Sequence, residues 1–409
     1  MVDVDLNAVK DLVQKSIDLE RLELGCERQT QVCKRQSPDF APLLLGHSQA
    51  FFGQSKENRE YKLGESVLSG GTSGENLVPE LNDYPHYCLA EQIASPKVML
   101  YEALWEILGW ARVPSDTQLS VRPNLHWFPG TCFGLNYKTS EEGTVWFSEH
   151  IGIDQALDID WDNVEKSGEV ARVVEHLTFF KENIPEGVNI SCPIAAGPLS
   201  IADSILGQDI WMLFYDQPEK VKLLISNISD MIIKLLKLFK GILGDPLESS
   251  WIGPLHMACG GVKLGDDSIV MMSPEMHKEF VLPSIERICS VFSGGYWHSC
   301  GHFPEHLKVI NSSEKITVVN LGEPEVWNMP DTVTRIFESG QLYYGGWARL
   351  PNESLEEYLR RGVDICGPER NRAILFAMGE KFGIKSGHWP NATQTMDLWH
   401  RLQDEIYPV

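Results

Sequence analysis

A histidine and a cysteine stand two positions apart in the segment YWHSCGH, residues 296–302. His298 and Cys300 follow two aromatic residues, at what reads as the end of an apolar strand. Side chains two positions apart in a strand lie on the same face, so both would point toward one place. A neutral imidazole and a thiolate together favour zinc over magnesium or calcium, which prefer oxygen ligands. The structural alternative is a half-buried strand that ends in a histidine and a small apolar cysteine.

A catalytic zinc ion has three protein ligands and one open position, so this segment lacks one ligand. We predict that the later thiol of Cys366, in GVDICGPE, supplies it. His302, His388, Glu323 and Glu380 are competing candidates for the same position.

Carboxylates also stand where predicted strands end. Asp266 and Asp267 close the segment GGVKLGDDS, and Glu323 follows ITVVNL. We predict catalytic roles for all three side chains. For the adjacent aspartates, the structural alternative is one helix cap beside one solvated charge.

Further residues at strand ends are suited to binding a small molecule. We predict that His47, Asn320 and Trp347 contact the substrate, and Cys192 and Glu380 stand at similar positions. The strands themselves are apolar, and their packing needs none of these side chains.

The elements that must position these residues alternate along the chain from about residue 185. Near-continuous apolar strands between helices are typical of a parallel sheet covered by helices. Together with an opening strand at 41–47, they predict an α/β protein whose strands close into an eight-stranded barrel. In such a barrel the chemistry lies at the C-terminal ends of the strands. The predicted strands are 188–194, 260–268, 296–301, 316–324, 341–347 and 373–380.

Helix signals stand between these strands. The predicted helices begin near Asp216, at Ser273 with a kink at Pro283, at Pro304, at 331–338 and after a cap at Asn352. The aromatic segment 123–137 is strand-like but is interrupted by proline and glycine. We predict that residues 1–80 form a helical extension with a Gly-rich loop or lid from Gly64, and that 81–409 form the barrel.

The overall charge limits the partners. The formal net charge is −22, which argues against binding to nucleic acid or to an anionic membrane, because both require basic surface. The amphipathic start of the chain is not a secretory signal, and the apolar run from Met231 is interrupted by three lysines. The nine cysteines have no paired spacing. We therefore predict a cytoplasmic protein with reduced thiols.

Three segments, taken in order, resemble the uroporphyrinogen decarboxylase superfamily. They are GPLSIADSILGQDIWMLFYDQPEKVKLLISNISD, LGDDSIVMMSPEMHKEFVLPSIERI and WHSCGHFPEHL. The likeness covers roughly residues 185–380 and is greater to the corrinoid-dependent methyltransferases than to the decarboxylases. It implies a single (β/α)8 TIM barrel with the site at its C-terminal mouth.

The resemblance also implies an activity. The methyltransferase branch holds zinc on an H-x-C pair, matched here by His298 and Cys300, and on a distant cysteine near the last strand. That cysteine falls near Met378 in this chain, upstream of which lies Cys366. Such enzymes move a methyl group between a cobalamin (corrinoid) on a partner protein and a small acceptor, such as a thiol or tetrahydrofolate, in anaerobic C1 metabolism.

Two alternatives follow from the same resemblance. A tetrapyrrole decarboxylase is disfavoured, because the Arg-rich loop that binds substrate carboxylates in that branch is replaced here by LLLGHSQAFFGQ. The other alternative is a non-catalytic barrel that binds a corrinoid or a porphyrin. A homodimer is compatible with each of these functions.

Overall fold

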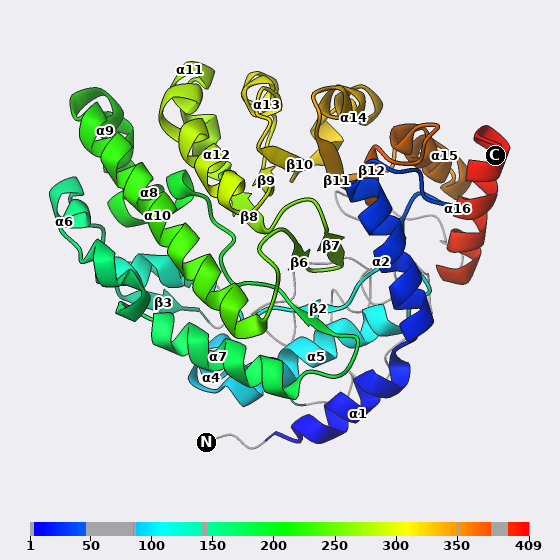
Figure 1. The fold of residues 1–409 in the computed structure, drawn as a ribbon, viewed down its shortest axis with the longest axis horizontal. Helices are drawn as coiled ribbons and strands as arrows, with labels where there is room; N and C mark the ends of the chain where they lie inside the picture. Colours follow the sequence, from blue (N-terminus) through cyan, green and yellow to red (C-terminus); the bar gives the residue numbers. More distant parts are fainter. Residues whose placement is uncertain are drawn as a thin grey trace.

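A parallel six-stranded sheet forms the centre of the molecule, and helices surround it (Figure 1). The computed structural model describes residues 4–45, 85, 87–140, 145–350, 352–377 and 392–408. The strand order is β1-β12-β11-β10-β9-β8. The strands are β1 (Leu43–Leu44), β8 (Val262–Gly265), β9 (Gly295–Ser299), β10 (Ile316–Leu321), β11 (Leu342–Trp347) and β12 (Ala373–Ala377).

A second parallel pair, β2 (Ser120–Val121) and β5 (Asn189–Ile190), lies between the two edges of this sheet. Isolated backbone hydrogen bonds join it to both edges. Asp116 N donates to Leu43 O near β1, and Gly265 N in β8 donates to Ala195 O just after β5. The arrangement is therefore TIM-barrel-like, although the described strands do not form one continuous closed ladder.

Most strands of the main sheet are followed by a helix that covers the outside. The helices are α1 (Leu6–Ser16), α2 (Leu19–Cys33), α4 (Leu89–Ala94), α5 (Pro96–Arg112), α6 (Ile153–Leu157), α7 (Val170–Asn183), α8 (Pro198–Leu206), α9 (Ile210–Asp216), α10 (Pro218–Leu243), α11 (Pro274–Met276), α12 (Leu282–Val291), α13 (Pro304–Asn311), α14 (Met329–Glu338), α15 (Leu355–Cys366) and α16 (Ala392–Ile406). None of the described helices has both the length and the apolar character needed to cross a membrane.

Alternation along the strands separates two apolar clusters. Tyr296, Val318 and Tyr344 belong to a smaller cluster that includes the hairpin of β6 (Ser250–Ile252) and β7 (Leu255–Met257). The hairpin lies inside the ring of helices, so we call this side of the sheet the inner face (Figure 1). The intervening residues, such as Trp297 and Val319, pack with the surrounding helices on the outer face. Because successive side chains of a strand point to opposite faces, only every second residue faces the interior.

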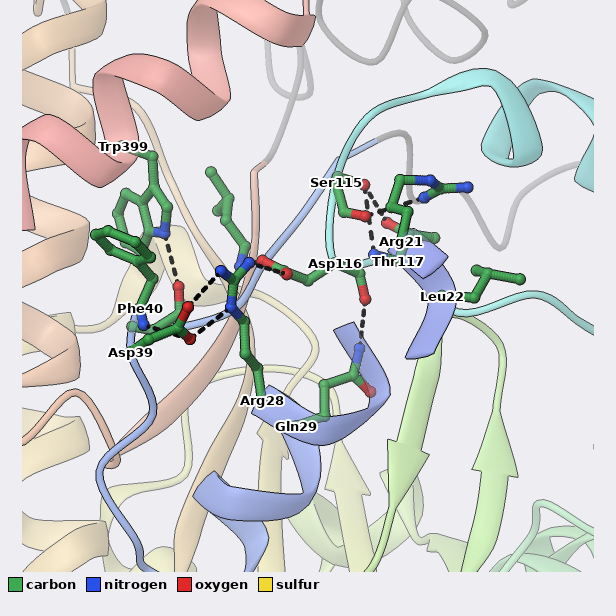
Figure 2. Close-up of polar contacts among 12 residues, drawn as sticks. Arg21, Leu22, Arg28, Gln29, Asp39, Phe40, Ser115, Asp116, Thr117 and Trp399 are labelled. Atoms are coloured by element: carbon green, nitrogen blue, oxygen red, sulfur yellow. Dashed lines mark hydrogen bonds and ion pairs between the residues drawn. The ribbon is translucent and has the colours of Figure 1, made fainter. Parts of the chain in front are cut away.

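The first part of the chain is attached to the barrel-like body by buried polar contacts (Figure 2). Arg28 on α2 pairs with Asp39 and with Asp116, at 2.7 and 2.8 Å. The other carboxylate oxygen of Asp116 accepts a hydrogen bond from Leu43 N at the start of β1. Strand β1, which lies within residues 1–80, pairs with β12 and so joins the main sheet.

Two local predictions need correction, and the irregularity predicted near Pro283 takes a specific form. The segment 123–137 holds a 3-10 helix at Phe128–Phe133 between turns, and a short antiparallel pair follows, β3 (Tyr137–Thr139) with β4 (Val145–Phe147). Helix α15 is capped by Ser354, not Asn352, through reciprocal bonds with Glu357. Near Pro283 the helix changes to a π-helical turn at His277–Val281, which accommodates the proline.

Candidate metal centre

Three potential metal ligands converge at the C-terminal edge of the sheet. His298 lies near the end of β9, Cys300 follows that strand, and Asp267 follows β8. One ligand atom from each lies within 4.8 Å of the other two. His298 and Cys300 continue the alternation that begins at Tyr296, so both project to the inner face, as their spacing predicts.

The distances within this group are short. His298 Nε2 lies 3.5 Å from Cys300 Sγ and 3.4 Å from Asp267 Oδ1. The same carboxylate oxygen accepts a hydrogen bond of 2.8 Å from Cys300 N, which holds the β8 loop against the end of β9. The Asp267 side chain is 60% exposed and that of His298 is 23% exposed, so a small molecule can reach the group.

Asn320 on β10 fixes the orientation of His298. Its Nδ2 donates to Tyr344 O at 2.6 Å, so its Oδ1 must face the imidazole. That oxygen lies 2.6 Å from His298 Nδ1, which must therefore carry a proton and donate it. In the neutral ring the lone pair is then on Nε2, directed at the thiol and the carboxylate.

This arrangement favours a cation between the three groups. Burial lowers the pKa of His298, so the ring is neutral at pH 7. A lone pair and a carboxylate oxygen 3.4 Å apart repel each other unless a cation or a shared proton lies near them. The thiol of Cys300 can donate one proton to Nε2, which is the structural alternative to a metal.

Gly322 leaves room for the pair. A Cβ atom at this position would lie 2.6 Å from Cys300 Sγ and 3.0 Å from His298 Cε1. The first of these contacts is shorter than real Cβ atoms show, so a larger residue here would require the Cys300 side chain to shift, and that of His298 to adjust slightly. Gly322 N also donates to Ser299 O, which ties the β10 loop to the end of β9.

Asp266, predicted to be catalytic, is fully buried beside the group. Its Oδ1 accepts a hydrogen bond from Ser200 N at the start of α8, and its own N–H donates to His298 O. Burial raises the pKa of its carboxyl to about 6. Asp266 therefore fixes the loop that presents Asp267 and does not itself face the opening.

The structure does not bring the predicted third ligand, Cys366, to this place. Cys366 ends α15 and its thiol lies 4.0 Å from Ala373 O, at the first residue of β12. It is therefore at the N-terminal edge of the sheet, opposite His298 and Cys300. Asp267 is the third potential ligand whose oxygen lies near His298 and Cys300.

The remaining predicted residues lie elsewhere. Trp347 is fully buried on the outer face, where its ring stacks on Tyr358 and its Nε1 donates to Tyr358 O. Glu323 precedes a 3-10 turn, and its carboxylate is not among the three converging ligands. His302 packs edge-on against Trp327. His47, Glu380 and His388 lie outside the described residues.

The sequence interpretation missed two basic residues near the group. Lys263 lies on β8, and Arg122 directly follows β2; both are half-buried and line one cavity. The sequence contained a signal for Lys263, because this lysine interrupts an apolar strand. It lies two positions before Gly265, on the same face of the strand, and Gly265 pairs with His298.

Comparison with known proteins supports the fold. No known family profile matches this chain, and no curated protein sequence matches it. A solved structure described as a methyltransferase from Methanosarcina mazei is similar, with a TM-score of 0.58. The likeness covers 93% of this chain and 98% of that chain at 12% sequence identity. At this identity the likeness is evidence for the fold alone.

Proposed function

We propose that this chain is a methyltransferase that moves a methyl group between a corrinoid on a partner protein and a small acceptor, with zinc held by Asp267, His298 and Cys300. One observation carries the proposal: a neutral imidazole, oriented by Asn320, directs its lone pair at a thiol and a carboxylate on an accessible edge. The structural neighbour is described as a methyltransferase, and three segments resemble corrinoid-dependent methyltransferases; both support the same chemistry.

The donor set fits zinc. Zinc lies about 2.0–2.3 Å from nitrogen, oxygen and sulfur ligands, so tetrahedral angles separate neighbouring ligand atoms by roughly 3.4–3.6 Å. The Nε2–Sγ and Nε2–Oδ1 distances are 3.5 and 3.4 Å. Three protein ligands would leave the fourth position to the acceptor.

Each residue has a separate task in this proposal. A bound zinc ion would lower the pKa of an acceptor thiol, so that the acceptor is a thiolate near pH 7. Asn320 keeps His298 in the tautomer that can bind a metal. Asp266 and Gly322 hold the loops after β8 and β10 so that the ligands meet. Both a thiol and tetrahydrofolate are possible methyl acceptors in this proposal.

A methyl-transfer assay tests this function. Zinc-loaded protein is mixed with methylcobalamin and with 2-mercaptoethanol, 3-mercaptopropionate or tetrahydrofolate, and the methylated acceptor is measured by mass spectrometry. We expect transfer by the unaltered protein and a fall to background in His298→Ala and Cys300→Ser. The matched controls are His302→Ala and Cys88→Ser, which change an imidazole and an exposed thiol outside the group.

The outcomes separate the alternatives. Full transfer by His298→Ala and Cys300→Ser would contradict the zinc-assisted function. Decarboxylation of uroporphyrinogen by metal-free protein would favour the decarboxylase. Binding of cobalamin without transfer to any acceptor would favour a non-catalytic barrel.

A further inference from the structure

Helix α2 packs along the hairpin of β6 and β7 and presents thiols to it. Gln29 Oε1 accepts a hydrogen bond of 2.7 Å from His256 N, and Cys26 Sγ lies 3.2 Å from His256 Nδ1. Cys33 follows Gln29 by four positions, so it lies one helical turn further along the same face. Cys259 follows His256 by three positions, and its side chain meets that of Cys33.

Cys33 and Cys259 are free thiols that contact each other at the N-terminal edge of the main sheet. Both belong to the smaller apolar cluster on the inner face. Their side chains hydrogen bond with each other, and the Cys33 sulfur also accepts from the backbone N–H groups of Ala258 and Cys259. Thr317 Oγ1 donates to Cys259 O at 2.6 Å, which fixes the backbone that carries the second thiol.

The surroundings make the two thiols unequal. The hydrogen bond from Cys259, together with the two backbone N–H groups, lowers the pKa of Cys33, whereas contact with Cys33 and burial raise the pKa of Cys259. A thiolate is the form of cysteine that reacts, so Cys33 is the nucleophile of the pair. Cys33 is 7% exposed and Cys259 is half-buried, so a small oxidant can reach them.

We propose that Cys33 and Cys259 form a redox-active dithiol that a hydroperoxide oxidises to a disulfide between α2 and the segment before β8. The Cys33 thiolate attacks one peroxide oxygen, the O–O bond breaks, and Cys33 becomes a sulfenic acid as hydroxide leaves. The Cys259 thiol then attacks that sulfur, the S–S bond forms, and the sulfenic oxygen leaves as water with the Cys259 proton. With hydrogen peroxide, the two sulfurs lose two electrons in total, and the peroxide and the two thiol protons become two water molecules.

The disulfide would fasten the N-terminal helices to the sheet. It joins α2, whose Arg28 pairs with Asp116, to the chain that leads into β8. A cross-link between residues so far apart in the sequence stabilises a fold chiefly by restricting the unfolded chain. The pair lies at the opposite edge of the sheet from the candidate metal centre, and this inference does not rest on methyl transfer.

Peptide mapping of the oxidised protein tests the pair. The full chain is treated with a small molar excess of hydrogen peroxide, alkylated and digested with trypsin. Cys33 is the sole cysteine of the tryptic peptide 29–34, and Cys259 that of 241–263. We expect these two peptides to be linked, with a mass two hydrogen atoms below their sum, and to separate after reduction. Linkage of either thiol to Cys26, or oxidation of Cys33 to a sulfinic acid without linkage, would overturn the proposal.

Thermal unfolding provides a second measurement, and the unaltered protein alone suffices for it. We expect the oxidised form to melt about 2–5 °C above the reduced form. Cys33→Ser and Cys259→Ser should melt at one temperature under both conditions, whereas the controls Cys26→Ser and Cys88→Ser should keep the shift. Equal melting temperatures of the oxidised and reduced unaltered protein would contradict a stabilising disulfide.

Discussion

At the scale of single residues, Asn320 orients His298 so that Nε2 of its ring faces Cys300 and Asp267. A histidine with a free ring orientation could offer either nitrogen, or could donate a proton to Asp267. The two bonds of the Asn320 amide, to His298 Nδ1 and to Tyr344 O, leave only Nε2 for a metal. Substrate binding by Asn320 stays a prediction, and the structure shows in addition that its amide orients His298.

Gly322 offers a test of the close approach. Gly322→Ala would place a methyl group 2.6 Å from Cys300 Sγ. We expect the affinity for zinc to fall by about tenfold or more, because both ligands must move, and stability to fall by about 1–3 kcal/mol. Zinc affinity is measured by competition with a chelator.

The matched control for this variant is Gly241→Ala on α10, where an added Cβ meets nothing within 4 Å. It should bind zinc normally and gain up to about 1 kcal/mol from the better helix former. If Gly322→Ala binds zinc with unchanged affinity, the side chains of His298 and Cys300 do not bind one zinc ion together.

The ammonium of Lys263 predicts a pH-dependent stability. Its folded pKa of about 7 lies below the value of about 10.4 expected in the unfolded chain. Between these values the unfolded chain binds more protons, so this group makes the protein more stable as pH rises from 7 to about 10. Lys263→Met lacks this dependence.

We therefore expect Lys263→Met to be more stable than the unaltered protein at pH 7, by on the order of a few kcal/mol. The difference should shrink as pH approaches 10. Urea unfolding at several pH values measures it for both proteins, which share all other titrating groups. If the difference in the free energy of unfolding between the two proteins stays constant from pH 7 to 10, the pKa of Lys263 is not lowered in the folded protein.

His298 and Cys300 could be predicted as potential metal ligands from the sequence, but the third residue of the group could not. His298 and Cys300 share a face because of their spacing in one strand, which is a local property. The third ligand depends on which loop crosses the end of β9. Asp267 reaches it through the hydrogen bond with Cys300 N, whereas Cys366 is at the other edge of the sheet. Such long-range placement leaves no local signal.

At the scale of elements, the ion pairs of Arg28 fasten α2 to the body (Figure 2). The side chains of Arg28 and Asp116 are only 7% and 4% exposed. Arg28→Met would leave the carboxylate of Asp116 buried without its cation, and we expect a loss of about 3–5 kcal/mol in the free energy of unfolding. Denaturant unfolding monitored by circular dichroism measures this loss.

Arg401→Met is the control for that experiment. Arg401 makes ion pairs with Glu356 and Glu405, but its side chain is 60% exposed. Its loss should change stability by less than about 1 kcal/mol. If both variants lose equally little, the contact between α2 and Asp116 does not stabilise the fold.

Elements with a strong local period were predicted well. The apolar runs from residue 260 onward correspond to β8, β9, β10, β11 and β12, and the helix from Pro304 matches α13. The hairpin of β6 and β7 was not predicted. Its strands are three residues each, so their pattern is too short to distinguish from a loop. The aromatic segment 123–137 was ambiguous because its glycines and prolines break any period.

At the scale of the whole molecule, the alternation of strands and helices specified the barrel-like architecture without specifying its activity. The similarity to the Methanosarcina mazei methyltransferase extends over most of both chains at 12% identity. Many sequences can satisfy the same apolar pattern, and function depends on the few side chains at the strand ends. The charge of −22 fits a small-molecule or protein partner better than nucleic acid.

The zinc content of the intact protein tests the central claim most directly. The protein is saturated with zinc, freed of loosely bound ions by gel filtration and measured by inductively coupled plasma mass spectrometry. We predict about one zinc ion per chain, by the three-ligand scheme, and its loss in His298→Ala and Cys300→Ser but not in His302→Ala. Unaltered protein without zinc, or the two ligand variants with full zinc, would contradict the account.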